Sequence, residues 1–137
     1  MPPIQRPSRI LVVDDNADNR FVLENLLAHR GHQVSSAVNG AEALAAVERE
    51  RPDLVLMDLD MPVMNGWEAI EHIRANPEVA SLPIIVLSAH ALLGDEEKAM
   101  PGQCDGFLPK PFNTQQVMAL IGEILERGRE PASDVSE

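Results

Sequence analysis

Short apolar runs alternate with longer segments of helical periodicity along this chain. The runs predict strands at residues 9–13, 33–37, 53–57, 83–87 and 106–109, and the periodic segments predict helices at about 17–30, 40–51, 66–76, 92–100 and 113–127. Such alternation is typical of βαβ units around a parallel sheet. Because parallel crossovers are nearly always right-handed, five units predict a three-layer, doubly wound α/β sandwich with a five-stranded parallel sheet.

Local signals indicate where several helices begin and end. Gly31 is placed to end the first helix, and Asn113 is a good N-cap for the last one. Pro101 and Gly102 would cost a helix interior about 3 and 1 kcal/mol. We therefore expect the fourth helix to end by Met100.

The first helix carries one apolar stripe. The stripe consists of Val22, Leu23, Leu26 and Leu27, which repeat at helical spacing. Phe21 falls outside the stripe. We therefore expect the stripe to pack on the sheet and the Phe21 ring to remain exposed.

The length of 137 residues predicts one domain. We place it at residues 9–127, after an N-terminal extension at 1–8. Residues 128–137 are polar, acidic and without periodicity, which is typical of a disordered tail.

The charge balance excludes several classes of partner. Lys and Arg number 11 against 22 Asp and Glu, which gives a formal net charge of −11. Such a surface repels nucleic acid and anionic lipid.

No apolar stretch approaches the roughly 18 residues of a membrane span, no secretory signal is evident, and the lone Cys104 cannot form an internal disulfide. We expect no nucleic-acid partner, no membrane association and a cytoplasmic location.

Reactive side chains follow four of the predicted strands. These residues are Asp14, Asp15, Asp58, Ser88 and Lys110. Because the carboxyl ends of parallel strands meet at one edge of the sheet, we expect them to gather there. Three carboxylates at such an edge suit a hard divalent cation such as Mg²⁺.

At four places the chain resembles the receiver domain of two-component response regulators, and the likeness extends over about residues 9–127. The matching segments are Val12–Asn16, Met57–Gly66, Leu87–Ala89 and Lys110–Phe112, which stand in this order at the ends of the first, third, fourth and fifth predicted strands. The resemblance implies the flavodoxin-like strand order 2-1-3-4-5.

A carboxylate at a strand end can attack phosphorus and form an acyl phosphate, which makes Asp58 the best candidate nucleophile. Asp14 and Asp15 would hold Mg²⁺ beside it. The resemblance implies that Asp15 and Asp58 bind the ion through their side chains and that Asp60 binds it through its backbone carbonyl. Asp14 would bind the ion either directly or through a water molecule.

The remaining site residues would contact or sense the phosphoryl group. Lys110 offers a positive charge and Ser88 a hydroxyl donor to the phosphate oxygens. The resemblance implies a switch in which Ser88 moves toward the phosphate and the Phe107 ring turns inward. It also places His90 and Asp60 where they can alter the rate of phosphate hydrolysis, and it implies a cis bond before Pro111.

Other assignments fit the residues less well. A calcium loop starting at Asp14 would need Gly where Asn19 stands and Glu where Asn25 stands. Phosphatases of the haloacid dehalogenase type share the Asp58–Asp60 spacing but carry it on the first strand of a longer chain.

We therefore expect a single-domain response regulator that takes a phosphoryl group onto Asp58 from a histidine kinase or a histidine phosphotransfer protein. Phe21 would be an exposed contact for the phosphodonor. Phosphorylation would change how the chain binds a downstream protein target. The chain would catalyse only its own phosphorylation and dephosphorylation. Two alternatives remain open: an interaction module that does not need phosphorylation, and a receiver excised from a hybrid kinase.

Overall fold

The computed structural model describes residues 8–59, 66–88, 105–109 and 113–129. Its strands are β1 (Arg9–Val13), β2 (Gln33–Ala37), β3 (Leu54–Asp58), β4 (Ile84–Ser88) and β5 (Gly106–Pro109). The helices in these ranges are α1 (Ala17–His29), α2 (Gly40–Glu50), α3 (Gly66–Ala75) and α5 (Thr114–Arg129). The helix expected at 92–100, with its end before Pro101, lies outside the described residues.

The five strands form one parallel sheet in the order β2-β1-β3-β4-β5, which confirms the expected fold. The central strand β3 is buried at all five positions. This agrees with its unbroken apolar sequence, because a parallel strand between two helical layers needs apolar side chains on both faces.

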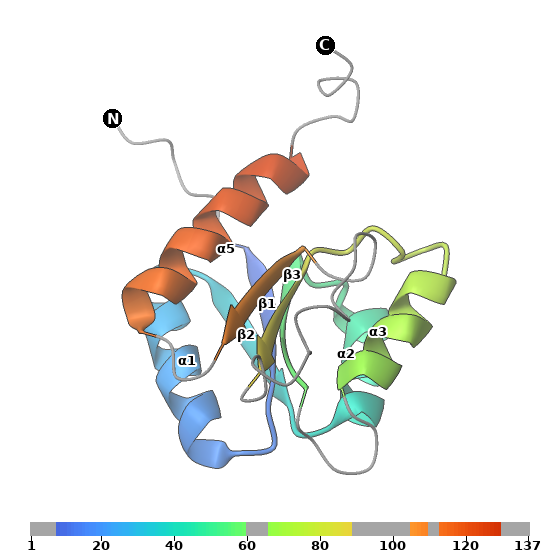
Figure 1. The fold of residues 1–137 in the computed structure, drawn as a ribbon, viewed down its shortest axis with the longest axis horizontal. Coiled ribbons are helices and arrows are strands. Elements are labelled where there is room, and N and C mark those ends of the chain that lie inside the picture. Colours follow the sequence, from blue (N-terminus) through green and yellow to red (C-terminus); the bar gives the residue numbers. More distant parts are fainter. Residues whose placement is uncertain (1–7, 60–65, 89–104, 110–112, 130–137) are drawn as a thin grey trace.

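Two hydrophobic layers lie on opposite faces of this sheet. Alternate residues of a strand point to opposite faces, so Ile10 and Val12 pack with α1 and α5, whereas Leu11 and Val13 pack with α2 and α3. Figure 1 shows the result, with α1 and α5 on one side of the sheet and α2 and α3 on the other. The three-layer sandwich is therefore confirmed.

Helix termini follow the local signals in the sequence. Gly31 has a φ of 93°, and the N–H groups of Gly31 and His32 donate to the carbonyls of Ala28 and Leu27 at 3.0 and 3.1 Å. This is a Schellman motif, in which glycine takes the left-handed position. At the start of α5, Asn113 Oδ1 accepts from Gln116 N at 2.7 Å and Gln116 Oε1 accepts from Asn113 N at 3.0 Å, a reciprocal capping box.

The structure corrects the boundaries of three elements. Strands β3 and β4 each lie one residue further along the chain than expected, so Asp58 is the last residue of β3 and pairs with Leu87. Helix α5 continues through Gly128 to Arg129, two residues past its expected end. One glycine costs a helix only about 1 kcal/mol, so it does not end α5 here.

The apolar stripe of α1 is narrower than expected. Leu23 and Leu27 are buried, but Val22 is 53% exposed. Helix α1 packs on the edge strand β2 and on its neighbour β1, so only the arc of the helix that faces these strands is covered. The exposure of Phe21, at 66%, is as expected. Within the described residues, no helix is both long and apolar enough to cross a membrane.

Candidate metal centre

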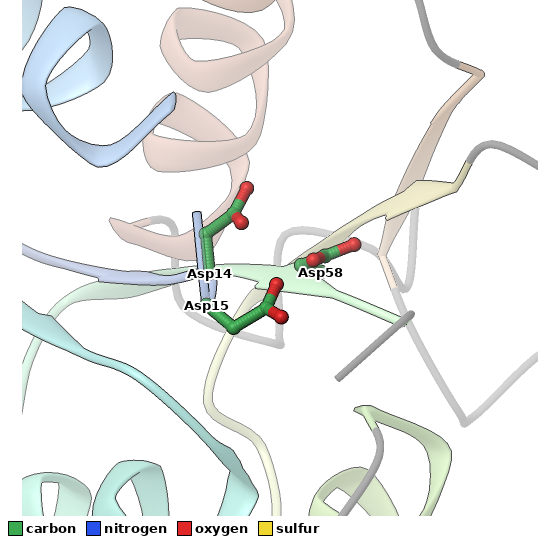
Figure 2. Close-up of side chains that lie close together, drawn as sticks. All are labelled: Asp14, Asp15 and Asp58. Carbon is green, nitrogen blue, oxygen red and sulfur yellow. The ribbon is translucent and has the colours of Figure 1, made fainter. Parts of the chain in front are cut away.

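The acidic residues meet because β1 and β3 are neighbours in the sheet. Val13 pairs with Met57, which brings Asp14, directly after β1, beside Asp58 at the end of β3. One carboxylate oxygen each of Asp14, Asp15 and Asp58 lies within 4.8 Å of the others. Figure 2 shows Asp14 and Asp15 at the end of β1, with the Asp15 carboxylate directed toward Asp58.

The three carboxylates differ in their access to solvent. Asp14 and Asp58 are each 1% exposed, whereas Asp15 is exposed. Three negative charges this close repel one another. A divalent cation would offset this repulsion. Clustered carboxylate oxygens, with solvent on one side, fit Mg²⁺, which binds few carboxylates and keeps several waters.

Asp14 is held firmly by its surroundings. Its backbone N–H donates to the carbonyl of Ala37 at 3.1 Å, and its Oδ1 accepts from the backbone N–H of Asn16 at 2.8 Å. Asn19 and Arg20, in the first turn of α1, contact it as well. The sequence interpretation did not identify these two residues, although the spacing of Asn16 and Asn19 marks a helix start.

The start of α3 packs closely against the end of β3, where Asp58 lies. Gly66 N donates to the carbonyl of Leu59 at 3.3 Å. A Cβ atom at position 66 would lie 2.6 Å from the Asp58 carbonyl oxygen and 2.9 Å from the Leu59 Cα. The start of α3 therefore approaches the end of β3 more closely than any residue with a side chain would allow.

The predicted phosphate-binding residues are only partly described. Ser88 is the last residue of β4, adjacent to β3, and pairs with Pro109. Lys110, Pro111, Asp60 and His90 lie outside the described residues, so their expected roles stay predictions.

Phe107 lies in β5 opposite Val86. Its ring is half-buried and packs against the hydrophobic layer under α2 and α3. This ring therefore already has an apolar environment, while its part in a switch remains a prediction.

Comparison with known proteins identifies the family. Residues 10–122 match the family model of the response regulator receiver domain. The chain is 31% identical over 119 residues to the polar-differentiation response regulator DivK of Brucella anthropi, covering 87% of this chain and 97% of DivK. It is 36% identical over 129 residues to the transcriptional regulatory protein PrrA of Mycobacterium bovis, covering 94% of this chain and 54% of PrrA, so it spans about half of that relative.

A solved structure shares both the fold and the sequence pattern. It is the receiver domain of the sensor histidine kinase PA1611 from Pseudomonas aeruginosa, described with a magnesium ion coordinated in its active site cleft. Its TM-score is 0.81 at 34% identity, and the match covers 88% of this chain and 99% of that one. Together with the parallel sheet and the acidic cluster, these matches show that the chain belongs to the receiver domain family of two-component response regulators.

Proposed function

We propose that this receiver accepts a phosphoryl group onto the carboxylate of Asp58 in a Mg²⁺-dependent reaction. The observation that carries the proposal is the meeting of Asp14, Asp15 and Asp58 within 4.8 Å at the carboxyl end of the sheet. Asp58 is buried at the end of the central strand β3, which places it beside Asp14 at the edge of the sheet. Positioning and charge neutralisation supply most of the catalysis in phosphoryl transfer.

In the proposed reaction, an Asp58 oxygen attacks the phosphorus of a phosphohistidine on a histidine kinase or phosphotransfer protein. The O–P bond forms as the P–N bond breaks, and the electron pair of that bond returns to the imidazole of the donor. Asp14, Asp15 and Asp58 would hold Mg²⁺, with the backbone carbonyl of Asp60. The bound metal supplies positive charge that neutralises the phosphoryl oxygens.

Ser88 and Lys110 then complete the contacts to the phosphoryl oxygens in our proposal, one as a hydroxyl donor and the other as a cation. Phe107 would turn further into the apolar layer as Ser88 moves, which alters the surface that a downstream protein target binds. His90 and Asp60 would tune how fast water removes the phosphate. The chain catalyses only its own phosphorylation and dephosphorylation in this scheme.

The phosphodonor would approach across Phe21, which is 66% exposed on α1, the helix that follows Asp14 and Asp15 in the chain. We propose a single-domain, cytoplasmic regulator, and the match to 97% of DivK supports the single-domain form. The receiver of PA1611 belongs to a sensor histidine kinase, which keeps the excised-receiver alternative open.

The test is incubation with a small acyl-phosphate donor and Mg²⁺, followed by intact-mass measurement. The mass should rise by one phosphoryl group, and Asp58→Asn should abolish the rise. Asp18→Asn is the matched control, because Asp18 is an exposed aspartate of the neighbouring helix. A wild-type protein that stays unmodified with and without Mg²⁺ would instead favour an interaction module that does not need phosphorylation.

A further inference from the structure

The N-cap and the first turn of α1 contact Asp14 at several atoms. The backbone N–H of Asn16 donates to Asp14 Oδ1 at 2.8 Å, and Asn19 Nδ2 donates to Asp14 Oδ2 at 3.2 Å. Arg20 Nη1 donates to the backbone carbonyl of Asp14 at 2.8 Å. Both carboxylate oxygens of one candidate metal ligand are thus held by the helix that follows it.

Asn19 differs from its neighbours in how it contacts Asp14. Asn16 uses its main chain, and the Arg20 guanidinium contacts only the Asp14 main chain. Among these three residues, Asn19 is the one whose side chain donates to the carboxylate. A substitution at position 19 can therefore remove a donor from Asp14 without changing the local main-chain contacts.

The carboxylate has a physical need for such a donor. Asp14 is 1% exposed, and one of its oxygens lies within 4.8 Å of oxygens of Asp15 and Asp58. A buried charged oxygen is costly unless a hydrogen-bond donor satisfies it. A neutral amide donor stabilises the charge without competing for a cation, whereas an ammonium or guanidinium at the same place would repel one.

The cap of α1 does not depend on the Asn19 side chain. The backbone N–H of Asn19 donates to Asn16 Oδ1 at 3.0 Å, and any residue other than proline at position 19 retains that bond. The Asn19 side chain lies on the exposed surface of the helix, so its removal leaves no cavity in the core. The loss of its amide therefore acts on Asp14 rather than on the stability of the helix.

We propose that Asn19 is a positioning residue of the metal centre, which holds the Asp14 carboxylate in the orientation that binds the divalent cation. This inference rests on the proposed function, because it assigns a role within the same Mg²⁺ site. It predicts a defect in cation affinity without a comparable defect in folding or in the chemical step.

The experiment compares wild type with Asn19→Leu and Asn19→Ala. Leucine preserves the size of the side chain and favours the helix, and alanine provides a second variant without an exposed apolar group. Asn25→Leu is the matched control on the same helix, because the Asn25 amide donates to the Phe21 carbonyl at 2.7 Å and not to Asp14. Titration calorimetry with Mg²⁺ gives the affinity, and the rate of phosphorylation by acetyl phosphate is measured over a range of Mg²⁺ concentrations.

We expect both Asn19 variants to bind Mg²⁺ about three- to tenfold more weakly, because the donor is an exposed side chain and its hydrogen bond has about the ordinary net strength. Their maximal phosphorylation rate at saturating Mg²⁺ and their thermal midpoint should stay close to those of the control. Mg²⁺ affinity within twofold of wild type in both variants, or an equal loss in Asn25→Leu, would overturn the inference. A wild-type protein that neither binds Mg²⁺ nor becomes phosphorylated would instead refute the proposed function itself.

Discussion

Replacing Gly66 with alanine tests how closely α3 must approach the end of β3, the strand that carries the proposed phosphoacceptor Asp58. The added Cβ would stand 2.6 Å from the Asp58 carbonyl oxygen and 2.9 Å from both the Cα and a side-chain methyl of Leu59. Two of these three neighbours are main-chain atoms. The clash cannot be relieved by rotating a side chain, so the end of β3 or the start of α3 must shift by several tenths of an ångström.

The magnitude follows from two opposing effects. Alanine at a glycine position stabilises a helix by about 0.5–1 kcal/mol through the unfolded chain. Overpacking a dense interior costs about 1–3 kcal/mol. Because the clash involves the backbone of a buried central strand, we expect overpacking to dominate and Gly66→Ala to lower the free energy of unfolding by about 1–2 kcal/mol.

The same shift should reach the chemistry. The displaced atom is the backbone carbonyl oxygen of Asp58, so the Asp58 carboxylate should shift with it. A misplacement approaching 1 Å at a reacting group can cost as much as about 100-fold in rate. We therefore expect Gly66→Ala to slow phosphorylation by acetyl phosphate at saturating Mg²⁺ by at least about tenfold. Chemical denaturation measures the stability and intact-mass kinetics measure the rate.

Gly122→Ala is the matched control, because Gly122 is exposed in α5 and a Cβ there meets no atom within 4 Å. It should raise the free energy of unfolding by about 0.5–1 kcal/mol and leave the phosphorylation rate unchanged. The reasoning is refuted if Gly66→Ala is as stable as Gly122→Ala, or if it is phosphorylated at the wild-type rate.

Three further substitutions test the local structure. Gly31→Ala should cost about 1–2 kcal/mol of unfolding free energy, because its φ of 93° strains any side chain although the space is open; a neutral result in denaturant titration contradicts this. Arg51 caps α2 in the left-handed conformation, at φ 51° and ψ 63°. Arg51→Gly should therefore raise the free energy of unfolding by about 0.5–1 kcal/mol, although it removes the exposed 2.6 Å ion pair with Glu78. A fall in unfolding free energy larger than that of Glu78→Gln would show that the Arg51 backbone is not strained. Hydrogen bonds from Ser35 and Arg49, with the charge of Arg9, hold the pKa of Glu50 below its ordinary value of 4.5. A lowered folded-state pKa gives stability that is present above pH 4.5 and lost as the pH falls through the folded-state pKa. In acid denaturation, the difference in unfolding free energy between wild type and Glu50→Gln should therefore shrink below pH 4.5. A difference that stays constant with pH would contradict the assigned cause.

The buried acids illustrate a conflict between stability and function in this protein. Asp14 and Asp58 are among the few buried polar or charged side chains in the described residues. Their proximity to Asp15 opposes folding in the absence of a cation. The hydrophobic layers on both faces of the sheet, and the contacts from α1 and α3, keep the acids together. Bound Mg²⁺ should therefore stabilise the fold as well as complete the site.

Local sequence signals determined most of the secondary structure. The bounds of β1 and β2, the Schellman end at Gly31 and the capping box at Asn113 agree with the structure. These features depend on neighbours a few residues away, which the sequence lists directly. The alternation of strands and helices also predicted the layers. The strand order came from resemblance to a family, because periodicity does not say which strands are adjacent.

Tertiary structure alone decided which side chains touch. The apolar stripe of α1 predicted a buried Val22, yet the sheet covers only the part of the helix that carries Leu23 and Leu27. The sequence placed acids at strand ends, but their approach to within 4.8 Å depends on the register of β1 against β3. The hydrogen bond from the Asn19 amide to Asp14 also depends on tertiary structure, as does the need for glycine at position 66. Contacts between elements depend on packing distance and register, which the pattern of one segment does not contain.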